Sequence, residues 1–470
     1  MYNPYSSTRR SFLKGSLAVT GGMLAGRLAP AAQTAPAANR PNFLFVLLDQ
    51  LSHDALSAYG NPYVSTPNMD RLINRGYSFM QSYSTNPICS PARSSLFTGR
   101  MPVETGVISN NRPIHRSCVN MGQWFSDNGY ETVYSGKWHL PLGQPTAIEG
   151  FTVLPHGSGQ GDLTDAEVSR NCEAYLKNRS GDNPFLLVTS ILQPHDICFW
   201  PVKVKGLNPE KLPLSYLEDQ LPQLPDNHTS RPKSCELMNG RIYRGWSEDQ
   251  WRYYSYIYYR QVEMADADIG RVIDALEDSG HAENTIVILT ADHGESLGRH
   301  MNVGKWHSYD ESVKVPFVVS WPGRIAEKKT DTSHLVSGVD VMSTLCDYAG
   351  ISEPPHSRGR SLKPLLEGNN TDWREFVVSE HHIIGRMVRS NDFKYVKYHG
   401  DDVEQLFDMK ADPGETVNLY DNSKYEDIVK DHRRMLDEWN AHLLPVKPTD
   451  CIGGIEPYLK KFVKDTPFEV

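Results

Sequence analysis

The stretch Asn42-Phe43-Leu44-Phe45-Val46-Leu47-Leu48 is a continuous apolar run that ends abruptly at Asp49-Gln50. An apolar run of this length without polar alternation is typical of a strand buried on both faces of a parallel sheet. Open α/β sheets bind their ligands just beyond the carboxyl ends of their strands. The position of Asp49 and Gln50 directly after the run therefore makes both of them candidate functional residues.

The same pattern recurs along the chain, and helical spacing lies between the repeats. Three further apolar runs lead into polar groups: 131–135 into Lys137 and His139, 185–192 into His195, and 285–290 into Asp292-His293. Alternating strands and helices predict a doubly wound, mostly parallel α/β sheet, which we assign to residues 40–350. A single Asp after a strand is usually a turn or cap residue, but four polar strand ends along one sheet edge indicate an active site.

The pattern of apolar and polar residues changes beyond residue 350. Pro354-Pro355 indicates a linker, and short alternating segments follow at 376–379 and 393–398. Residues 425–443 have the spacing of an amphipathic helix. We therefore expect residues 351–470 to form a smaller α+β subdomain on an antiparallel sheet.

Composition bounds the class of protein. The chain has 470 residues, of which 39% are hydrophobic and 22% charged, which excludes a disordered acidic chain and a bundle of membrane helices. Lys and Arg number 48 against 57 Asp and Glu, so binding to nucleic acid through phosphate neutralisation is not expected. Seven cysteines in this length are too few for a disulfide scaffold.

The first 39 residues have the pattern of an export signal. Thr8-Arg9-Arg10-Ser11-Phe12-Leu13-Lys14 precedes a short, weakly apolar stretch and then an Ala/Pro-rich run. The paired arginines before Phe-Leu-Lys resemble a twin-arginine signal, which implies the twin-arginine translocase as a partner and a periplasmic or extracellular destination. The apolar stretch is too short to span a bilayer, so no stable membrane anchor is expected.

The strongest local signal is Cys89-Ser90-Pro91-Ala92-Arg93, followed by Leu96-Phe97-Thr98-Gly99-Arg100. Pro91 suits the first turn of a helix and Gly99 suits its end. This arrangement puts Cys89 at a helix N-terminus, where free N–H groups favour anions. A plain buried cysteine is the ordinary alternative, but it does not explain Arg93 one helical turn further on.

These motifs resemble the sulfatase family, a branch of the alkaline phosphatase superfamily. The segment 89–100 is similar to its signature Cys/Ser-x-Pro-x-Arg…Thr-Gly-Arg, and Gly136-Lys137-Trp138-His139 resembles its Gly-Lys-Trp-His box. Further landmarks follow in order across the chain to about residue 425: the opening strand at 41–49, Asp292-His293-Gly294-Glu295, the segment 304–316 that carries a distal lysine, 359–366 and 406–419.

The resemblance implies a modified nucleophile and a metal. The signature cysteine of the family is oxidised to Cα-formylglycine, so it implies that fate for Cys89 and a formylglycine-generating enzyme as a partner. Asp49, Gln50, Cys89, Asp292 and His293 would form the metal site, with Ca²⁺ expected and Mn²⁺ or Mg²⁺ possible. Many sulfatases carry Asp-Asp and Asp-Asn where this chain has Asp-Gln and Asp-His. That departure also resembles the branch with phosphonate monoester hydrolases and choline sulfatases.

The resemblance also implies roles for the remaining polar groups. Arg93 would hold the nucleophile or the carboxylates, and Lys137 would bridge the nucleophile and the sulfate. His139 is the candidate base, while His195 and Lys305 would face the leaving oxygen, with His195 as the expected acid. Other histidines compete with His195 for contacts near the ester: His115, His156, His307, His381 and His382.

Three functions remain open from the sequence. The leading prediction is an exported sulfuric-ester hydrolase acting on a carbohydrate sulfate or another sulfated small molecule. The alternatives are a phosphonate monoester or phosphodiester hydrolase, and a non-catalytic protein that binds sulfated glycans. Substrate recognition is expected from Phe199-Trp200-Pro201, the segment 207–243 and the C-terminal subdomain. Trp200, Trp246, Trp251 and the tyrosines at 253–259 could stack on a sugar, but we expect most of those tyrosines in the core.

Overall fold

The computed structural model describes residues 40–201, 216–234, 246–369, 371–381, 385–399 and 403–452. Its centre is an eight-stranded sheet with the order β5-β4-β6-β1-β7-β8-β2-β9. All neighbours in it are parallel except that β8 runs antiparallel to both β7 and β2. The strands are β1 (Asn42–Asp49), β2 (Tyr77–Phe79), β4 (Glu131–Gly136), β5 (Thr152–Val153), β6 (Phe185–Pro194), β7 (Thr285–Ala291), β8 (Phe317–Ser320) and β9 (Lys329–Asp331).

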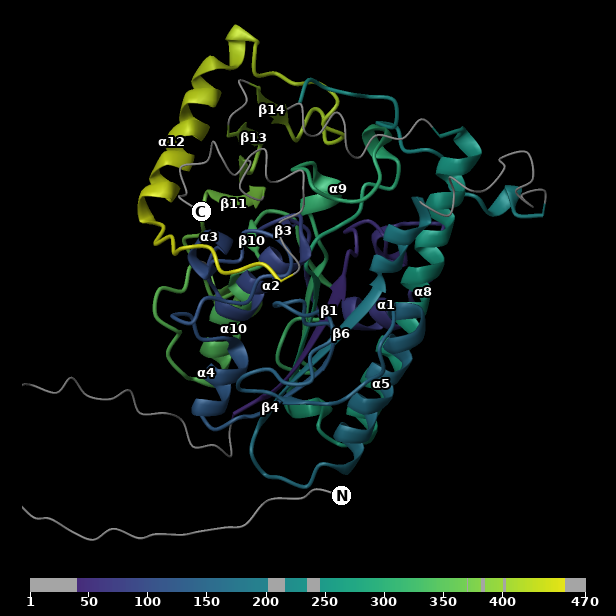
Figure 1. Cartoon of the computed structure of the whole chain (residues 1–470), viewed down its shortest axis with the longest axis vertical. Coiled ribbons are helices and arrows are strands. Elements are labelled where there is room, and N and C mark those ends of the chain that lie inside the picture. The colour runs from purple at the N-terminus through teal and green to yellow at the C-terminus, as the bar shows by residue number, and fades with distance from the viewer. Residues whose placement is uncertain are drawn as a thin grey trace, which may run out of the picture. The chain divides into compact units, whose positions relative to one another are not determined.

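Helices cover both faces of this sheet (Figure 1). One face packs against α1 (Pro67–Asn74), α5 (Gly161–Asn178) and α8 (Glu248–Asp278), and the other against α2 (Cys89–Thr98), α4 (Met121–Asp127), α10 (Asp340–Ala349) and α11 (Lys363–Leu366). Leu44, Val46 and Leu48 of β1 point into the first core and Phe43, Phe45 and Leu47 into the second. Burial on both faces is why β1 shows no polar alternation, and the predicted doubly wound fold is confirmed.

The register of the central strands brings their carboxyl ends to one edge. Gly136 of β4 pairs with Ser190 of β6, Asp49 of β1 pairs with Pro194 of β6, and Leu48 pairs with Ala291 of β7. The residues that follow these positions are Lys137, His195, Gln50 and Asp292. The sheet therefore delivers the four polar strand ends side by side, as the sequence predicts.

A second sheet lies C-terminal to the first. It is an antiparallel meander of β11 (Phe376–His381), β12 (Gly385–Ser390), β13 (Phe393–Tyr398) and β14 (Glu404–Asp408), covered by α12 (Glu426–His442). Arg389 of β12 donates to the Tyr83 hydroxyl of β3 (Ser82–Tyr83) at 2.9 Å. Lys394 of β13 forms an ion pair of 2.5 Å with Asp310 of α9 (Asp310–Val313). The predicted antiparallel subdomain is confirmed, while its boundary at 350/351 stays a prediction.

Short elements complete the described chain. They are α3 (Pro102–Thr105), β10 (Val336–Ser337), and the 3₁₀ turns η2 (Ser57–Tyr59), η3 (His195–Phe199), η5 (Glu218–Gln220), η6 (Ala282–Asn284), η7 (Arg299–Met301) and η8 (Ser423–Tyr425). No helix within the described ranges is long and apolar enough to cross a membrane. The described cysteines form no disulfide. The predicted export signal at 1–39 lies outside the described residues.

Helix α8 begins ten residues earlier than the apolar spacing at 258–279 predicts. Ser247 caps it by accepting from the Gln250 N–H at 3.3 Å, and its first turns carry an aromatic cluster rather than aliphatic residues. Trp251, Tyr254 and Tyr258 of this cluster are at most 1% exposed and belong to the core. Tyr259 is buried as well, so three of the five tyrosines at 253–259 are structural, as expected for most of them.

Candidate active site

Two buried carboxylates lie at the carboxyl edge of the sheet. Asp49 ends β1 and Asp292 follows β7, and neither is more than 1% exposed. The guanidinium of Arg93, from α2, joins them: Nη2 donates to Asp49 Oδ2 at 3.0 Å and Nε donates to Asp292 Oδ2 at 2.8 Å. Its Nη1 donates to the Lys137 carbonyl at 2.8 Å and the Ser190 hydroxyl at 2.9 Å. Arg93 thus fixes three strand ends with one side chain.

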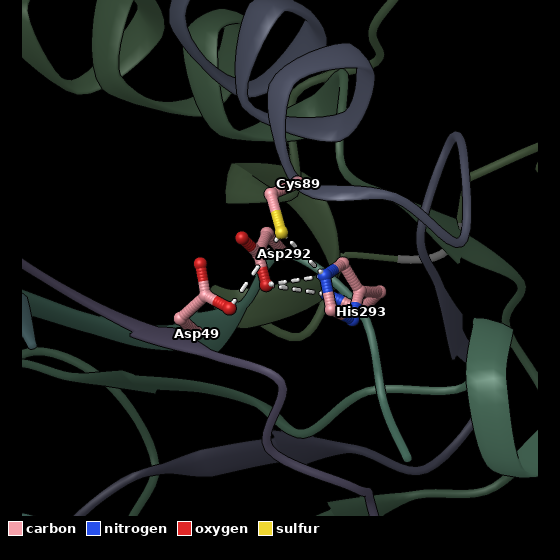
Figure 2. Close-up of side chains that lie close together, drawn as sticks. All are labelled: Asp49, Cys89, Asp292 and His293. Carbon is pink, nitrogen blue, oxygen red and sulfur yellow. Dashed lines mark hydrogen bonds and ion pairs between the residues drawn. The ribbon is translucent and has the colours of Figure 1, made fainter. Parts of the chain in front are cut away.

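Cys89 is the first residue of α2, so its side chain extends from the helix N-terminus toward the two carboxylates. Its Sγ lies 3.1 Å from His293 Nε2 and 3.7 Å from Asp49 Oδ1 (Figure 2). Lys305 Nζ donates to the same Sγ at 3.3 Å. The Pro91 and Gly99 pattern therefore correctly predicts a helix that presents Cys89 to the strand ends.

Burial and neighbouring charges shift the pKa values of the cluster residues in opposite directions. Burial would raise the pKa of Asp49, but Lys137, whose Nζ is 2.6 Å from Oδ2, and Arg93 hold that pKa well below its usual range. Burial and the charge of Asp49 raise the pKa of Asp292 to about 6. Burial and Asp49 also oppose ionisation of Cys89, but Lys137 and Lys305 outweigh them and hold the pKa of the thiol well below its usual range. The site is thus built to hold an anion at position 89.

The donor set of the cluster fits a divalent cation. One atom each from Asp49, Cys89, Asp292 and His293 lies within 4.8 Å of the others, and all four residues are buried (Figure 2). His293 Nδ1 donates to the Gly294 carbonyl at 3.0 Å, which leaves the Nε2 lone pair for a ligand in the neutral ring. The two carboxylates suit Ca²⁺, Mg²⁺ or Mn²⁺, and the imidazole favours a metal that tolerates nitrogen, such as Mn²⁺.

Gln50 lies beside this cluster with its amide orientation fixed. Its Nε2 donates to Glu295 Oε2 at 2.5 Å, and its Oε1 accepts from Lys305 Nζ. Glu295 Oε1 in turn accepts from the Tyr254 hydroxyl at 2.8 Å and from the Gly304 N–H at 2.6 Å. The structure therefore brings Gln50 and Lys305 to the predicted site, each anchored by a buried partner.

A cavity of about 450 Å³ opens next to the cluster. Lys137, His139 and His195 line it, together with His156 and Asp165. Burial and Lys137 lower the pKa of His139, and the same causes lower the pKa of His195 to about 4. Nδ1 of His139 and Nδ1 of His195 are buried, and neither has a hydrogen-bond partner among the described residues. Both rings are therefore placed to meet a bound molecule.

The histidines that could compete with His195 for contacts near the ester lie in different parts of the structure. His156 shares the cavity, whereas His307 is buried between the Ser296 and Ser312 hydroxyls at 2.8 and 2.9 Å. His115 bonds to the Ser117 hydroxyl at 2.7 Å, outside the residues that line the cavity. His381 is fully buried in β11, and His382 lies outside the described residues. Much of the segment 207–243 also lies outside them.

The structure adds residues to the site that sequence reasoning misses. Besides Glu295 and Ser190, Cys198 donates to Gln50 Oε1 at 3.2 Å, and Asn111 Oδ1 lies 3.2 Å from His139 Nε2. Asp165 of α5 accepts from the Leu192 and Gln193 N–H groups at 2.8 and 2.7 Å. Only Glu295 had a sequence signal, because it lies in the quoted segment 292–295.

Two family models match the chain. The sulfatase model matches residues 41–351, and the model of the C-terminal part of N-sulphoglucosamine sulphohydrolase matches residues 298–442. A Delta 4,5-hexuronate-2-O-sulfatase of Bacteroides thetaiotaomicron is 32% identical over 88% of this chain and 91% of its own length. An N-acetylglucosamine-6-O-sulfatase of the same organism is 26% identical over 85% and 86%.

Solved structures agree with this assignment. The structure of a 2-O GAG sulfatase has a TM-score of 0.73 and 30% identity, covering 87% of this chain and 98% of that one. The phosphonate monoester hydrolase of Agrobacterium radiobacter has the same fold, with a TM-score of 0.72 and 23% identity over 86% and 96%. With its signature cysteine, strand-end carboxylates and C-terminal sheet in place, the chain belongs to the sulfatase family of hydrolases.

Proposed function

We propose that the chain hydrolyses a sulfate ester of a carbohydrate, with Cys89 as the precursor of the nucleophile. The observation that carries this proposal is the convergence of Asp49, Cys89, Asp292 and His293 within 4.8 Å, beside a cavity lined by Lys137, His139 and His195. The first four residues can hold a metal and a nucleophile, and the next three can bind and protonate an ester.

The carboxylates of Asp49 and Asp292 and His293 Nε2 would hold the cation, for which we propose Ca²⁺. Gln50 Oε1 would join them by exchanging a bond that it now accepts from Lys305 or Cys198. A cation bound there would polarise the ester oxygens and favour the ionised nucleophile. Arg93 keeps the two carboxylates in place through its 3.0 and 2.8 Å bonds, so the ligands are preorganised.

Cys89 is proposed to be oxidised to Cα-formylglycine. Once formed, its hydrated aldehyde would supply one oxygen that attacks sulfur and displaces the leaving oxygen, and deprotonation of the second hydroxyl would then expel the sulfate as the aldehyde re-forms. The chain contributes the setting. Position 89 is the first residue of α2, where the helix dipole favours negative charge, and Lys137 and Lys305 stabilise that charge.

Proton transfer is assigned to the two cavity histidines. His139 has its Nδ1 without a partner and a lowered pKa, which suits a base that takes a proton from the nucleophile's second hydroxyl. His195 is proposed to protonate the leaving oxygen. An anionic ester in the cavity would favour the charged form of the ring and so raise its pKa from about 4.

The lining of the cavity supports a sugar as the substrate. Gln144, Gln160 and Thr164 add neutral polar groups to the four basic side chains Lys137, His139, His156 and His195. Among the described residues that line the cavity, the one acid is Asp165, and it already accepts two backbone N–H bonds. A sugar that carries a second anion, as a sulfated hexuronate does, would meet no uncompensated negative charge there. The names of the relatives, which act on hexuronate and N-acetylglucosamine sulfates, point the same way.

The first test is mass spectrometry of the tryptic peptide 76–93 from protein made in its own host, followed by turnover of matched substrates. We expect a peptide lighter by the exchange of H₂S for O. We also expect release of sulfate from an unsaturated hexuronate 2-sulfate or a glucosamine 6-sulfate. The Cys89→Ala variant is the control. An unmodified thiol in active enzyme would refute the proposed nucleophile, and binding of these sugars without turnover would favour the non-catalytic alternative.

A phosphonate monoester or phosphodiester hydrolase remains the second candidate. The observation that favours it is the metal set itself, in which Gln50 and His293 replace two of the family's acidic or amide positions. Fewer negative ligands leave the cation more attractive to any tetrahedral monoanion. The ratio of kcat/KM for an aryl sulfate and the matching aryl phosphonate separates the two. We expect it to favour the sulfate, and a ratio below one would favour the alternative.

Export is proposed from Arg9-Arg10 in residues 1–39. Fractionation of the native host should find the protein in the periplasm or medium, without residues of the leader. Replacing both arginines with lysine should retain it in the cytoplasm, because the twin-arginine receptor reads the pair. Export of that variant at the native level would contradict the assignment.

A further inference from the structure

The backbone beside Cys89 is tied to the loop that carries Asn110 and Asn111. Asn110 Oδ1 accepts from the Ser90 N–H at 3.0 Å, and the Asn111 N–H donates to the Ser90 hydroxyl at 3.2 Å. That hydroxyl donates to the His139 carbonyl at 2.6 Å. The residue next to the nucleophile, the loop and the candidate base therefore form one hydrogen-bonded unit.

Asn111 also fixes the imidazole of His139. Its Oδ1 lies 3.2 Å from His139 Nε2, and an amide oxygen can only accept. Nε2 therefore carries the hydrogen, and in the neutral ring the lone pair is on Nδ1, the buried nitrogen without a partner. An acceptor that fixes the tautomer of a reactive histidine is a common device in hydrolases.

The two residues that make this contact have unusual backbones. Asn111 has a φ of 63° and His139 a φ of 62°, both in the left-handed region. Asn tolerates this region better than most residues, whereas His139 depends on its surroundings to stay there. The bond from Ser90 to the His139 carbonyl supplies part of that support.

The C-terminal strap, residues 444–452, holds this loop from the outside. Its Val446 N–H donates to the Val103 carbonyl at 3.0 Å, its Thr449 N–H to Gly106 at 3.1 Å, and its Ile452 N–H to Asn111 at 2.9 Å. In Figure 1 the strap is the yellow segment that leaves α12 and runs beside α3.

Side chains strengthen the contact between the strap and the loop. The Thr449 hydroxyl donates to the Pro113 carbonyl at 2.7 Å, and the buried guanidinium of Arg112 donates to the Thr449 carbonyl. A Cβ on Gly106 would lie 3.2 Å from the Lys447 carbonyl, so the two backbones approach closely. The last described residues of the chain therefore bear on the loop that orients His139.

We propose that Asn111 is the positioning residue of His139, and that the C-terminal strap keeps Asn111 in place. The inference rests on the proposed role of His139 as the base. It makes a segment more than 300 positions away in the sequence part of the catalytic architecture. The contacts themselves do not depend on turnover, so the two proposals can fail separately.

The first experiment compares Asn111→Leu with Asn111→Asp. Leu has a similar size but accepts no hydrogen bond, and Asn111→Gly, which also lacks the acceptor but tolerates the φ of 63°, controls for backbone strain in the Leu variant. In both the Leu and the Gly variant kcat should fall roughly 10²-fold while KM changes little, as for a misoriented group. Asp keeps the acceptor and should restore most of the rate. Each kcat is normalised to the formylglycine content of peptide 76–93. An unchanged kcat in Asn111→Gly, or a loss in Asn111→Asp equal to that in Asn111→Leu, would overturn the assignment.

The second readout is the ¹⁵N spectrum of the histidine rings, with the His139 signals assigned by difference from His139→Gln. It is recorded on the Cys89→Ala chain, which has no nucleophile. We expect the Nε2–H tautomer in the parent and a mixture of tautomers after Asn111→Leu. An Nδ1–H ring in the parent would refute the positioning role. A parent with the expected tautomer but no turnover in the wild-type enzyme would instead refute the proposed function.

The strap is tested by two truncations. Ending the chain after residue 443 removes every strap contact and should lower kcat as much as Asn111→Leu does. Ending it after residue 452 keeps them and serves as the control with native kcat. If the shorter chain does not fold, Thr449→Pro removes the N–H and hydroxyl bonds to Gly106 and Pro113 but leaves the rest of the strap, and a severalfold loss of kcat is expected. Native kcat in the shorter chain or in Thr449→Pro would refute the role of the strap.

Discussion

The charged cluster (Asp49, Arg93 and Asp292) and the wall of the adjacent cavity (His139 and His195) differ in whether their polar groups already have partners. In the cluster, Asp49, Arg93 and Asp292 have no more than 1% exposure, and the guanidinium uses all three nitrogens on buried partners. In the wall, His139 and His195 each leave Nδ1 without a partner. The cluster is thus complete before a substrate arrives, whereas the wall is completed by the substrate. Substitutions in the cluster should therefore affect every substrate, and those in the wall should differ from one substrate to another.

The largest effect is expected from Cys89→Ala. Removing the nucleophile should lower kcat by at least ~10⁴-fold on every sulfate ester, as for other covalent catalysts. Binding of a sulfated sugar, measured by calorimetry, should persist because the cavity wall is intact. Cys118→Ser is the matched control: Cys118 donates to the Glu104 carbonyl at 3.4 Å and accepts from Arg100 Nη1 at 3.3 Å, and a hydroxyl can replace both bonds. Residual turnover within tenfold of the wild type would contradict the assignment of Cys89.

The next largest effect is expected from Arg93→Met. It leaves two buried carboxylates without their shared partner, so the free energy of unfolding should fall by about 3–5 kcal/mol. Urea denaturation at neutral pH measures it. Arg71→Met is the control, because the Arg71 side chain is 26% exposed and its partner Asp274 is 61% exposed. That ion pair should contribute about 0–1 kcal/mol. Equal losses in the two variants would mean that the cluster is not the preorganised unit described above.

The side chains that follow the strands were predictable in both the cluster and the wall, whereas the residues that support them were not. Asp49 and Asp292 could be predicted because each directly follows an apolar run, and Cys89 because Pro91 and Gly99 mark the helix ends. These signals are local. Asn111 contacts the ring of His139, 28 positions away, and Asp165 accepts from the backbone of Leu192, 27 positions away. The sequence around a polar residue does not indicate a partner at such a distance.

The fold, too, has features that local sequence signals predict and features that they do not. Continuous apolar runs predicted the parallel strands, but an apolar run carries no direction, so the antiparallel course of β8 was not predictable. The early start of α8 was missed because Trp251 and Tyr254 replace the aliphatic residues that mark a helical stripe. In the C-terminal sheet the alternation at 393–398 was informative, since its two faces pack against different partners.

A moderate, pH-dependent effect is expected from His195→Gln in the wall. Burial and Lys137 lower the pKa of His195 to about 4 in the folded chain, against about 6.5 in the unfolded one. Between these values the unfolded chain binds the extra proton, so stability is lost as the pH falls from 6.5 to 4. The melting temperature of the variant should therefore fall less steeply over this range. His442→Gln, on an exposed turn of α12, should keep the wild-type slope. A slope in His195→Gln equal to that of the wild type would refute the burial of a neutral ring.

The smallest effect is expected from Gly161→Ala, which tests how the wall is joined to the sheet. Asp165 accepts from the Leu192 and Gln193 N–H groups, while Asp196 accepts from the Asp162 N–H at 2.9 Å, so α5 and the end of β6 cap each other. A Cβ on Gly161 would lie 2.9 Å from the Gln193 nitrogen, and the strand end before His195 would have to move.

The cost of this overpacking should be about 1–3 kcal/mol, with a severalfold rise in KM for the sugar sulfate. Gly143→Ala is the matched control, since Gly143 lines the same cavity but a Cβ there meets nothing within 4 Å. Thermal melts measure the loss of stability, and KM values for one sulfated sugar and one aryl sulfate measure the effect on binding. Because the cluster does not touch Gly161, kcat for the small aryl ester should change less than KM for the sugar. A kcat loss that is equal for both esters would show that the wall and the cluster are one rigid unit, which would remove the contrast drawn between them.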